Sequence, residues 1–107
     1  MNYTQPWKRY DRFAPVLFAD GYKVSIQAGT NMYSTPRIHG AQAYSHVELG
    51  LPNRHDELLE GYAEGGNTIS QTEAVFPYVP AGVVLALIHK HGAIVDGQLP
   101  PLDFTEQ

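Results

Sequence analysis

His46 and Glu48 are the one pair of side chains in this sequence whose types and spacing could support acid–base chemistry. Residues two apart on a strand point to the same face, about 6.6 Å apart along the strand, and a carboxylate near an imidazole can make a general base. Hydrolysis by such a base also needs a nucleophile, and the same alternation predicts that Ser45 points to the opposite face. Because no nucleophile is predicted beside the pair, our first interpretation assigns no catalytic residue. A small hydrolase that uses His46 and Glu48 is kept as an alternative.

Five histidines and no cysteine raise the question of a metal site. The histidines are His39, His46, His55, His89 and His91. None of their spacings matches the i, i+4 pair of a helical zinc site, and His89 and His91 would point about 200° apart on a helix. The cysteine ligands of most structural zinc sites are also missing. We therefore expect no metal ion and no cofactor, and we expect His91 to stabilise the end of a helix through the helix dipole.

Aromatic and basic side chains are concentrated before the first predicted strand. Twelve of the 107 residues are Trp, Tyr or Phe, and aromatic residues together with arginine anchor many protein interfaces. We expect a partner protein to be bound by this N-terminal arm and by one strand face, through Trp7, Arg9, Tyr10, Arg12, Tyr44, His46 and Glu48. The alternative is a module that binds or sequesters a nucleotide-like ligand, in a pocket lined by Tyr33, Arg37 and His39 or shared across a homo-oligomer.

The net charge of −4 is unevenly distributed along the chain. Residues 1–37 hold five basic and two acidic side chains, whereas the remaining residues hold two basic and nine acidic ones. A domain that binds nucleic acid is expected to be markedly basic, so the charge argues against such a partner. The apolar run at 79–88 is about half of the ~20 residues needed to span a bilayer, and no apolar signal segment precedes it. We expect a cytoplasmic protein that has no membrane partner.

An Asp-Gly pair between two apolar runs predicts a β-hairpin over residues 15–28, with a type I′ turn. Alternation then places Tyr22, Val24, Ile26 and Ala28 on its buried face. Further strands are predicted at 43–49 and 72–79, and Ile94 and Val95 are expected to return to the sheet.

Two helices are predicted between and after these strands. Asn53 can cap a short helix that ends near Glu64, and Pro80 suits the first turn of a longer helix that ends at His91, before Gly92. The fold class is α+β: a small, mainly antiparallel sheet of four to five strands with one packed C-terminal helix and a second short helix. We expect an N-terminal arm at 1–14, a single domain at 15–96 and a loose tail at 97–107.

Four segments resemble a family of small uncharacterised proteins of bacteriophages and prophages over about residues 15–95. They are Ala-Asp-Gly-Tyr-Lys-Val-Ser-Ile-Gln-Ala-Gly at 19–29, Tyr-Ser-Thr-Pro-Arg at 33–37, Val-Glu-Leu-Gly-Leu-Pro at 47–52, and Tyr-Val-Pro with the valine-rich helix that follows. The resemblance implies a phage or prophage accessory protein that binds a protein of the bacterial host, in the host cytoplasm. Inhibition of a host defence system, as by an anti-CRISPR protein, is the sharpest form of this expectation.

Overall fold

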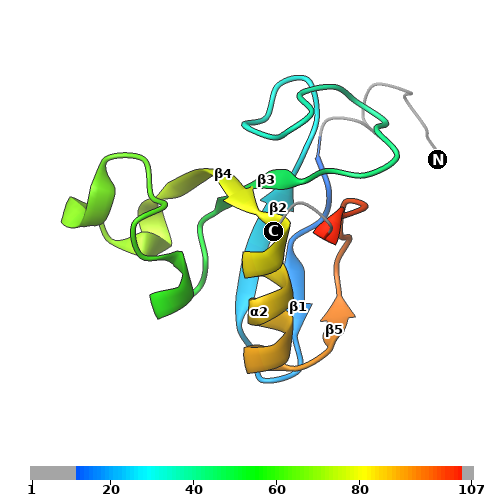
Figure 1. Cartoon of the computed structure of the whole chain (residues 1–107). Coiled ribbons are helices and arrows are strands. Elements are labelled where there is room, and N and C mark those ends of the chain that lie inside the picture. Colours follow the sequence, from blue (N-terminus) through cyan, green and yellow to red (C-terminus); the bar gives the residue numbers. More distant parts are fainter. Residues whose placement is uncertain (1–11, 105–107) are drawn as a thin grey trace, which may run out of the picture.

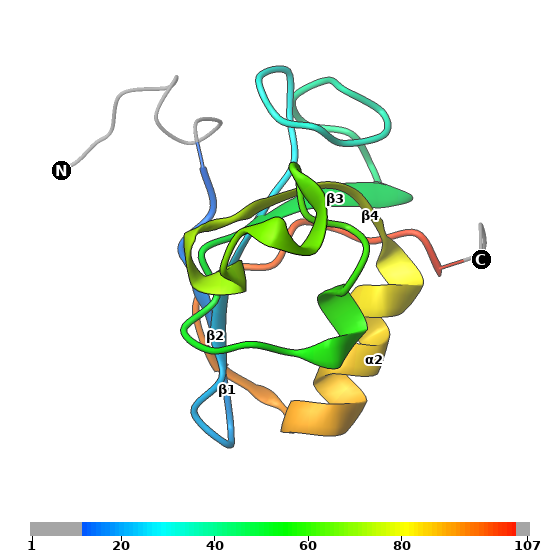
Figure 2. The same ribbon diagram turned by 90° about the vertical axis from the view of Figure 1, so that its left-hand side faces the viewer.

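A five-stranded antiparallel sheet forms the centre of the computed structural model, which describes residues 12–104 (Figure 1). The strand order is β4-β3-β2-β1-β5. The strands are β1 (Val16–Phe18), β2 (Lys23–Gln27), β3 (His46–Gly50), β4 (Val75–Pro80) and β5 (Ile94–Asp96). Helix α2 (Ala81–His91) packs against one face of this sheet (Figure 2). The α+β class predicted from the sequence is therefore confirmed, with five strands and one main helix.

Strands β1 and β2 form the predicted hairpin, although its turn is of another type. The N–H of Gly21 donates to Phe18 O (2.9 Å) and the N–H of Phe18 donates to Tyr22 O (2.8 Å), which makes a three-residue turn. Only Gly21 in this turn has a positive φ, of 94°. A type I′ turn needs a positive φ at both central residues, so the type I′ prediction was wrong and the turn is a type I turn with a glycine bulge.

The apolar face of the sheet and the inner side of α2 form the core. Tyr22, Val24 and Ile26 of the hairpin are buried, as alternation predicted. Val47 and Leu49 on β3 lie on the same buried side, and Ile26 pairs directly with Leu49. Helix α2 contributes side chains at helical spacing, namely Ala81, Val84, Leu87 and His91. The helix predicted here is confirmed, and it ends at Gly92, which has a φ of 93°.

The second predicted helix, from Asn53 to Glu64, is not formed. This stretch holds only the 3₁₀ turn η1 (Glu57–Leu59), which Asp56 caps by accepting a hydrogen bond from the N–H of Leu58. Two further 3₁₀ turns follow, η2 (Gly66–Thr68) and η3 (Gln71–Glu73). Asn53 serves the hairpin instead, because its side chain accepts from the N–H of Lys23 and donates to Gly21 O. A glycine in left-handed backbone at 61 prevents a longer helix.

The loop at 28–45 crosses the end of the sheet, and strand β3 begins later than predicted. Residues 43–45 are not in the strand; Thr35 and His46 form an isolated bridge there. Strand β4 likewise begins at Val75 instead of residue 72, because η3 occupies the residues before it. Ile94 and Val95 do return to the sheet as part of β5.

Residues 98–103, which the sequence predicts to be part of a loose tail, are hydrogen bonded to the body of the protein. The N–H of Gln98 donates to Ala14 O (3.1 Å), and the N–H of Tyr44 donates to Pro101 O (2.9 Å). The N–H of Asp103 in turn donates to Tyr44 O (2.8 Å). These bonds attach the tail to two separate loops.

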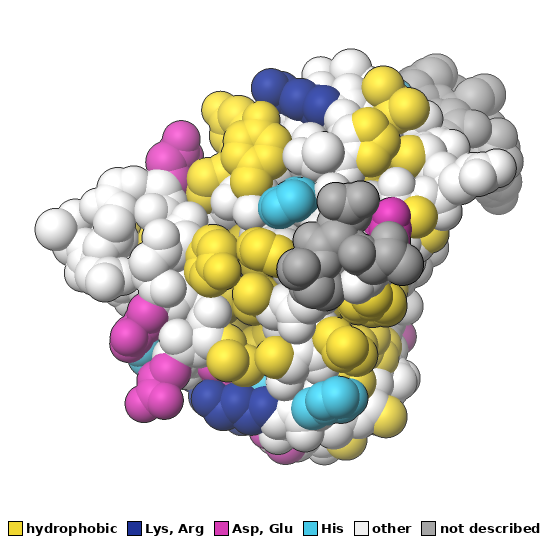
Figure 3. Space-filling view, in the orientation of Figure 1, with side chains coloured by type: hydrophobic (Ala, Val, Ile, Leu, Met, Phe, Trp, Pro, Cys, Tyr) yellow, Lys and Arg dark blue, Asp and Glu magenta, His cyan; other side chains and the backbone are white. Residues whose placement is uncertain are grey.

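Apolar side chains also remain on the surface. Figure 3, in the orientation of Figure 1, shows hydrophobic side chains at several places on the face that carries α2, with charged side chains between them. No helix within residues 12–104 is long and apolar enough to cross a membrane.

Candidate functional site

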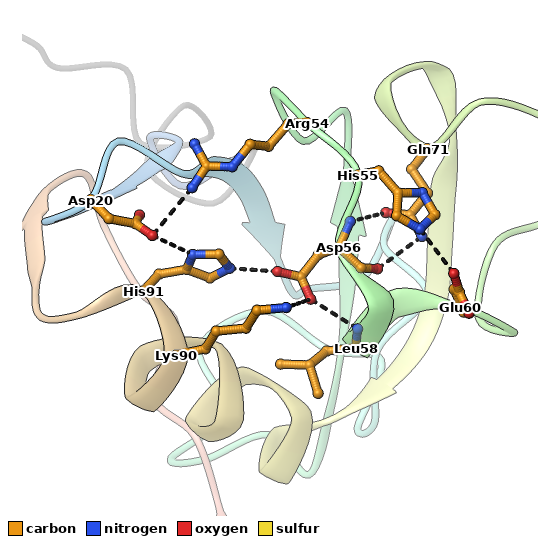
Figure 4. A network of polar contacts seen from close by, with 9 residues as sticks. All are labelled: Asp20, Arg54, His55, Asp56, Leu58, Glu60, Gln71, Lys90 and His91. Carbon is orange, nitrogen blue, oxygen red and sulfur yellow. Dashed lines mark hydrogen bonds and ion pairs between the residues drawn. The ribbon is translucent and has the colours of Figure 1, made fainter.

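A buried histidine lies between two carboxylates at the C-terminal end of α2 (Figure 4). His91 Nδ1 lies 2.7 Å from Asp20 Oδ2, and His91 Nε2 lies 2.5 Å from Asp56 Oδ2. Asp20 comes from the hairpin turn and lies 71 positions before His91 in the sequence. Asp56 caps η1 and lies 35 positions before His91. The network joins the hairpin, the loop before η1 and the helix.

Both carboxylates are held in the ionised form. Burial of Asp56 acts to raise its pKa, but hydrogen bonds from the Leu58 N–H, His91 and Lys90 outweigh burial and lower the pKa below its usual range. The hydrogen bond from His91 and the N–H of Tyr22 lower the pKa of Asp20 as well. Each ring nitrogen of His91 faces a carboxylate oxygen, so the ring bridges Asp20 and Asp56.

Basic and aromatic side chains surround this network. Lys90 Nζ lies 3.1 Å from Asp56 Oδ1, and Arg54 reaches Asp20 at 3.2 Å. The ring of Tyr22 stacks on the imidazole with 4.2 Å between centroids. Burial, with the nearby charge of Asp56, raises the pKa of Tyr22, so this phenol stays neutral. The imidazole therefore has an aromatic face above it and a carboxylate at each edge.

A carboxylate–imidazole–carboxylate row lacks the parts that hydrolysis needs. Both ring nitrogens of His91 are already bonded, and the side chain is 5% exposed. No serine or threonine hydroxyl in the described part of the chain is hydrogen bonded to a member of the row. The row joins three elements of the fold, and His91 lies in the last turn of α2, where interaction with the helix dipole stays a prediction.

The most distinctive surface feature is a pair of exposed tyrosines from different elements. The rings of Tyr33 and Tyr78 lie 5.7 Å apart, and the guanidinium of Arg37 lies 5.0 Å from the centroid of the Tyr33 ring. We call these three residues the tyrosine patch. Arginine over an aromatic face is a favourable contact, and it keeps both groups at the surface in a fixed arrangement.

A β-bulge holds Tyr78 in this position. Val47 pairs with Val79 and Leu49 pairs with Phe76, so two residues of β4 oppose Glu48 alone. Tyr78 has a φ of 52°, in left-handed backbone that an L residue seldom adopts. Its N–H donates to Tyr33 O (3.1 Å), which ties the bulge to the neighbouring loop. Strain of this kind often marks functional positions.

The predicted acid–base pair does not form. The carboxylate of Glu48 accepts a hydrogen bond from the N–H of Tyr33 (2.9 Å), whereas His46 Nδ1 lies 2.9 Å from Ser45 Oγ. The prediction that Ser45 points away from His46 was wrong, because Ser45 precedes β3 and does not follow the alternation of the strand. Within residues 12–104, no carboxylate contacts His46 to orient it as a base.

The remaining predicted residues fall in three places. Tyr44 is 2% exposed and its hydroxyl donates to Ile38 O, so it is a core residue and not the surface contact we expected. Arg37 and His39 lie in one loop with Tyr33: Arg37 Nε donates to Thr30 O and the N–H of Thr30 donates to His39 Nδ1. Trp7, Arg9 and Tyr10 lie outside the described residues, next to Arg12.

Sequence reasoning missed Asp20, Asp56 and Tyr78 as members of these sites. Asp20 was predicted as a turn residue, which it is, and Asp56 was expected in the first turn of a helix but caps the 3₁₀ turn η1. One signal was present: His91 falls on the buried face of its helix, and a buried imidazole needs polar partners. Nothing in the sequence indicates the positive φ of Tyr78.

No group of three or more His, Asp or Glu side chains in the part of the chain that the structure describes is arranged to hold a metal ion. Comparison of the chain with protein-family models, curated proteins and solved structures gives no match.

Proposed function

We propose that this protein is a non-enzymatic binding protein and that the tyrosine patch is the centre of its contact with a partner protein. The observation that carries the proposal is the Tyr33–Tyr78 pair, exposed and braced by Arg37. Tyrosine and arginine dominate the residues whose truncation costs most at protein interfaces. Tyrosine offers a large contact area with few rotatable bonds, so little conformational entropy is lost on binding.

The patch is also held in place before any partner arrives. The N–H of Tyr33 is fixed by Glu48, and its carbonyl oxygen is fixed by the N–H of Tyr78. A surface that is already ordered pays less entropy on association, which favours tight binding from a small area. The strained backbone at Tyr78 does not serve to bury its side chain in the core, since the residue is 43% exposed.

The partner we propose is a protein of a bacterial host, as the resemblance to phage and prophage proteins implies. Inhibition of a host defence complex is the specific form of this proposal. We also predict a second contact with this partner, made by the N-terminal arm through Trp7, Arg9 and Tyr10.

A nucleotide-like ligand is the second candidate, because Arg37 and His39 both contact the backbone of Thr30 and Arg37 lies over the Tyr33 ring. An aromatic ring and a guanidinium are the groups that bind a base and a phosphate. This candidate predicts that a small molecule, and not a protein, is retained by the purified chain.

The test is affinity capture from a bacterial lysate, with mass spectrometry of the retained proteins and of small molecules released on denaturation. Tyr33→Ala and Tyr78→Asn remove the two rings, and asparagine tolerates left-handed backbone. Each should weaken capture of the partner about 30-fold, the effect of losing about 2 kcal/mol at an interface. Leu85→Ala is the matched control, since Leu85 is equally exposed on α2. Loss of capture in the control, or none in the tyrosine variants, would refute the proposal.

A further inference from the structure

A groove lies on the face of the sheet opposite α2. It has a volume of about 530 Å³, within the range of small-molecule sites. Its floor includes Ser25 and Gly50 from the two central strands, and one wall is the segment that enters β1, including Phe13 and Ala14. Figure 2 shows this N-terminal segment on the side of the sheet away from α2.

The groove is kept open by two features of its lining. Gly50 has no side chain, and a Cβ added there would meet no atom within 4 Å. Gln27, the large polar residue on the floor, is drawn aside because its amide pairs with Phe13: Nε2 donates to Phe13 O (2.7 Å) and Oε1 accepts from the Phe13 N–H (2.6 Å). The hydrogen-bonding groups of this glutamine are therefore satisfied within the protein.

The charged groups of the lining leave an excess of positive charge. Arg12 and Lys23 both line the groove, and neither has an ion-pair partner within residues 12–104. The one carboxylate in the lining, that of Glu48, accepts a hydrogen bond from the N–H of Tyr33. Two unengaged cations in a concave surface of a protein with net charge −4 concentrate an anion at this place.

Apolar atoms complete the lining. Leu51 stands on the rim with 62% of its surface exposed and a φ of 50°. Among the described residues other than glycine, it shares a positive φ only with Tyr78. Val75 contributes a second aliphatic side chain. An exposed leucine held in strained backbone beside a hollow indicates a contact surface for an apolar group.

We propose that this groove binds a small organic anion: a flat apolar body with one carboxylate, sulfonate or phosphate group. The body would lie over Gly50 against Leu51, and the positive charges of Arg12 and Lys23 would attract the acidic group. The groove shares no residue with the tyrosine patch, although Glu48 of its lining accepts from the N–H of Tyr33, and the proposal does not depend on the function proposed for the patch.

The experiment uses the full chain and two matched probes, anilinonaphthalene sulfonate and the neutral phenylnaphthylamine with the same rings. Fluorescence titration gives the dissociation constants, and amide chemical shifts map where each probe binds. We expect the sulfonate to bind at least tenfold more tightly, with shifts at Ser25, Gly50 and Gln98. Lys23→Gln and Arg12→Gln should each weaken it about threefold, and the double variant about tenfold.

Gly50→Leu fills the floor and should abolish binding without lowering the melting temperature, because the glycine has ordinary backbone and open space beside it. If that variant does not fold, the charge variants still decide. Equal affinity for the two probes, shifts outside the groove, an unaltered affinity in the double charge variant, or no binding to the full chain would each overturn the proposal.

Discussion

Removal of the Asp56 carboxylate is the sharpest test of how this fold is held together. The side chain is 1% exposed and accepts hydrogen bonds from three donors: the N–H of Leu58, Lys90 Nζ and His91. Asp56→Ala leaves a buried imidazole and a backbone N–H without this partner. Breaking a buried charged pair in this way costs about 3 to 5 kcal/mol.

This loss is a large fraction of the whole free energy of unfolding, which is about 5 to 15 kcal/mol for a domain. It corresponds to a fall in melting temperature of about 12 to 40 °C, at roughly 4 to 8 °C per kcal/mol for a chain of this size. Urea and thermal unfolding at pH 7, followed by circular dichroism, measure both quantities.

Asp56→Asn should cost less, about 1 to 3 kcal/mol. The amide oxygen still accepts from the Leu58 N–H, and the amide nitrogen can donate to His91 Nε2 if the ring is neutral and keeps its proton on Nδ1. The surface control is Glu60→Ala, which breaks the exposed pair with His55 and should cost less than about 1 kcal/mol. An Asp56→Ala variant no less stable than Glu60→Ala would refute the reasoning.

Three further predictions concern the pH dependence of stability and two other contacts in the fold. Folding lowers the pKa of both Asp20 and Asp56. The stability that these carboxylates give to the fold should therefore be complete above the ordinary carboxyl pKa of about 4, and it should be lost as pH falls below that value. Urea unfolding of the wild type from pH 7 to pH 2 should show this fall in the free energy of unfolding, and a flat profile would contradict it. Gly97→Ala should destabilise by more than about 2 kcal/mol in thermal melts, with Gly50→Ala as a neutral control, because a Cβ at Gly97 would lie 2.0 Å from a backbone oxygen. Gln27→Leu should lower the free energy of unfolding by about 2 kcal/mol, because the N–H and the carbonyl oxygen of Phe13 both lose their partner in the Gln27 amide. Urea unfolding equal to that of the wild type would contradict this.

The elements that a local pattern specifies were predictable, and the contacts between distant loops were not. Alternation placed Val24 and Ile26 in the core, and helical spacing placed the buried face of α2, since each pattern depends only on neighbours in the sequence. The helix predicted at 53–64 does not form: Asn53, its expected cap, is engaged by the hairpin 30 residues away, and Gly61 has a positive φ. A sequence alone does not show which of two hydrogen-bonding roles such a side chain takes.

The candidate sites show the same limit. The sequence analysis named Tyr33 and Arg37 as ligand-binding residues because of their side-chain types. They are four residues apart in one loop, so a turn of that loop is enough to bring them into contact. Tyr78 completes the patch from strand β4, and its position depends on a bulge that no residue type indicates. The partners of His91 are 35 and 71 residues distant, so its burial could be predicted but its partners could not.

Side chains that imitate backbone pairing explain how a chain with so many loops is fixed. The amide of Gln71 accepts from the N–H of Asp56 (2.8 Å) and donates to its carbonyl oxygen (3.0 Å), as the amide of Gln27 does for Phe13. Asp56 is thus fixed through its backbone by one loop and through its side chain by α2. Since the tyrosine patch shares none of these residues, variants of Tyr33 and Tyr78 test binding without removing the contacts that hold the fold.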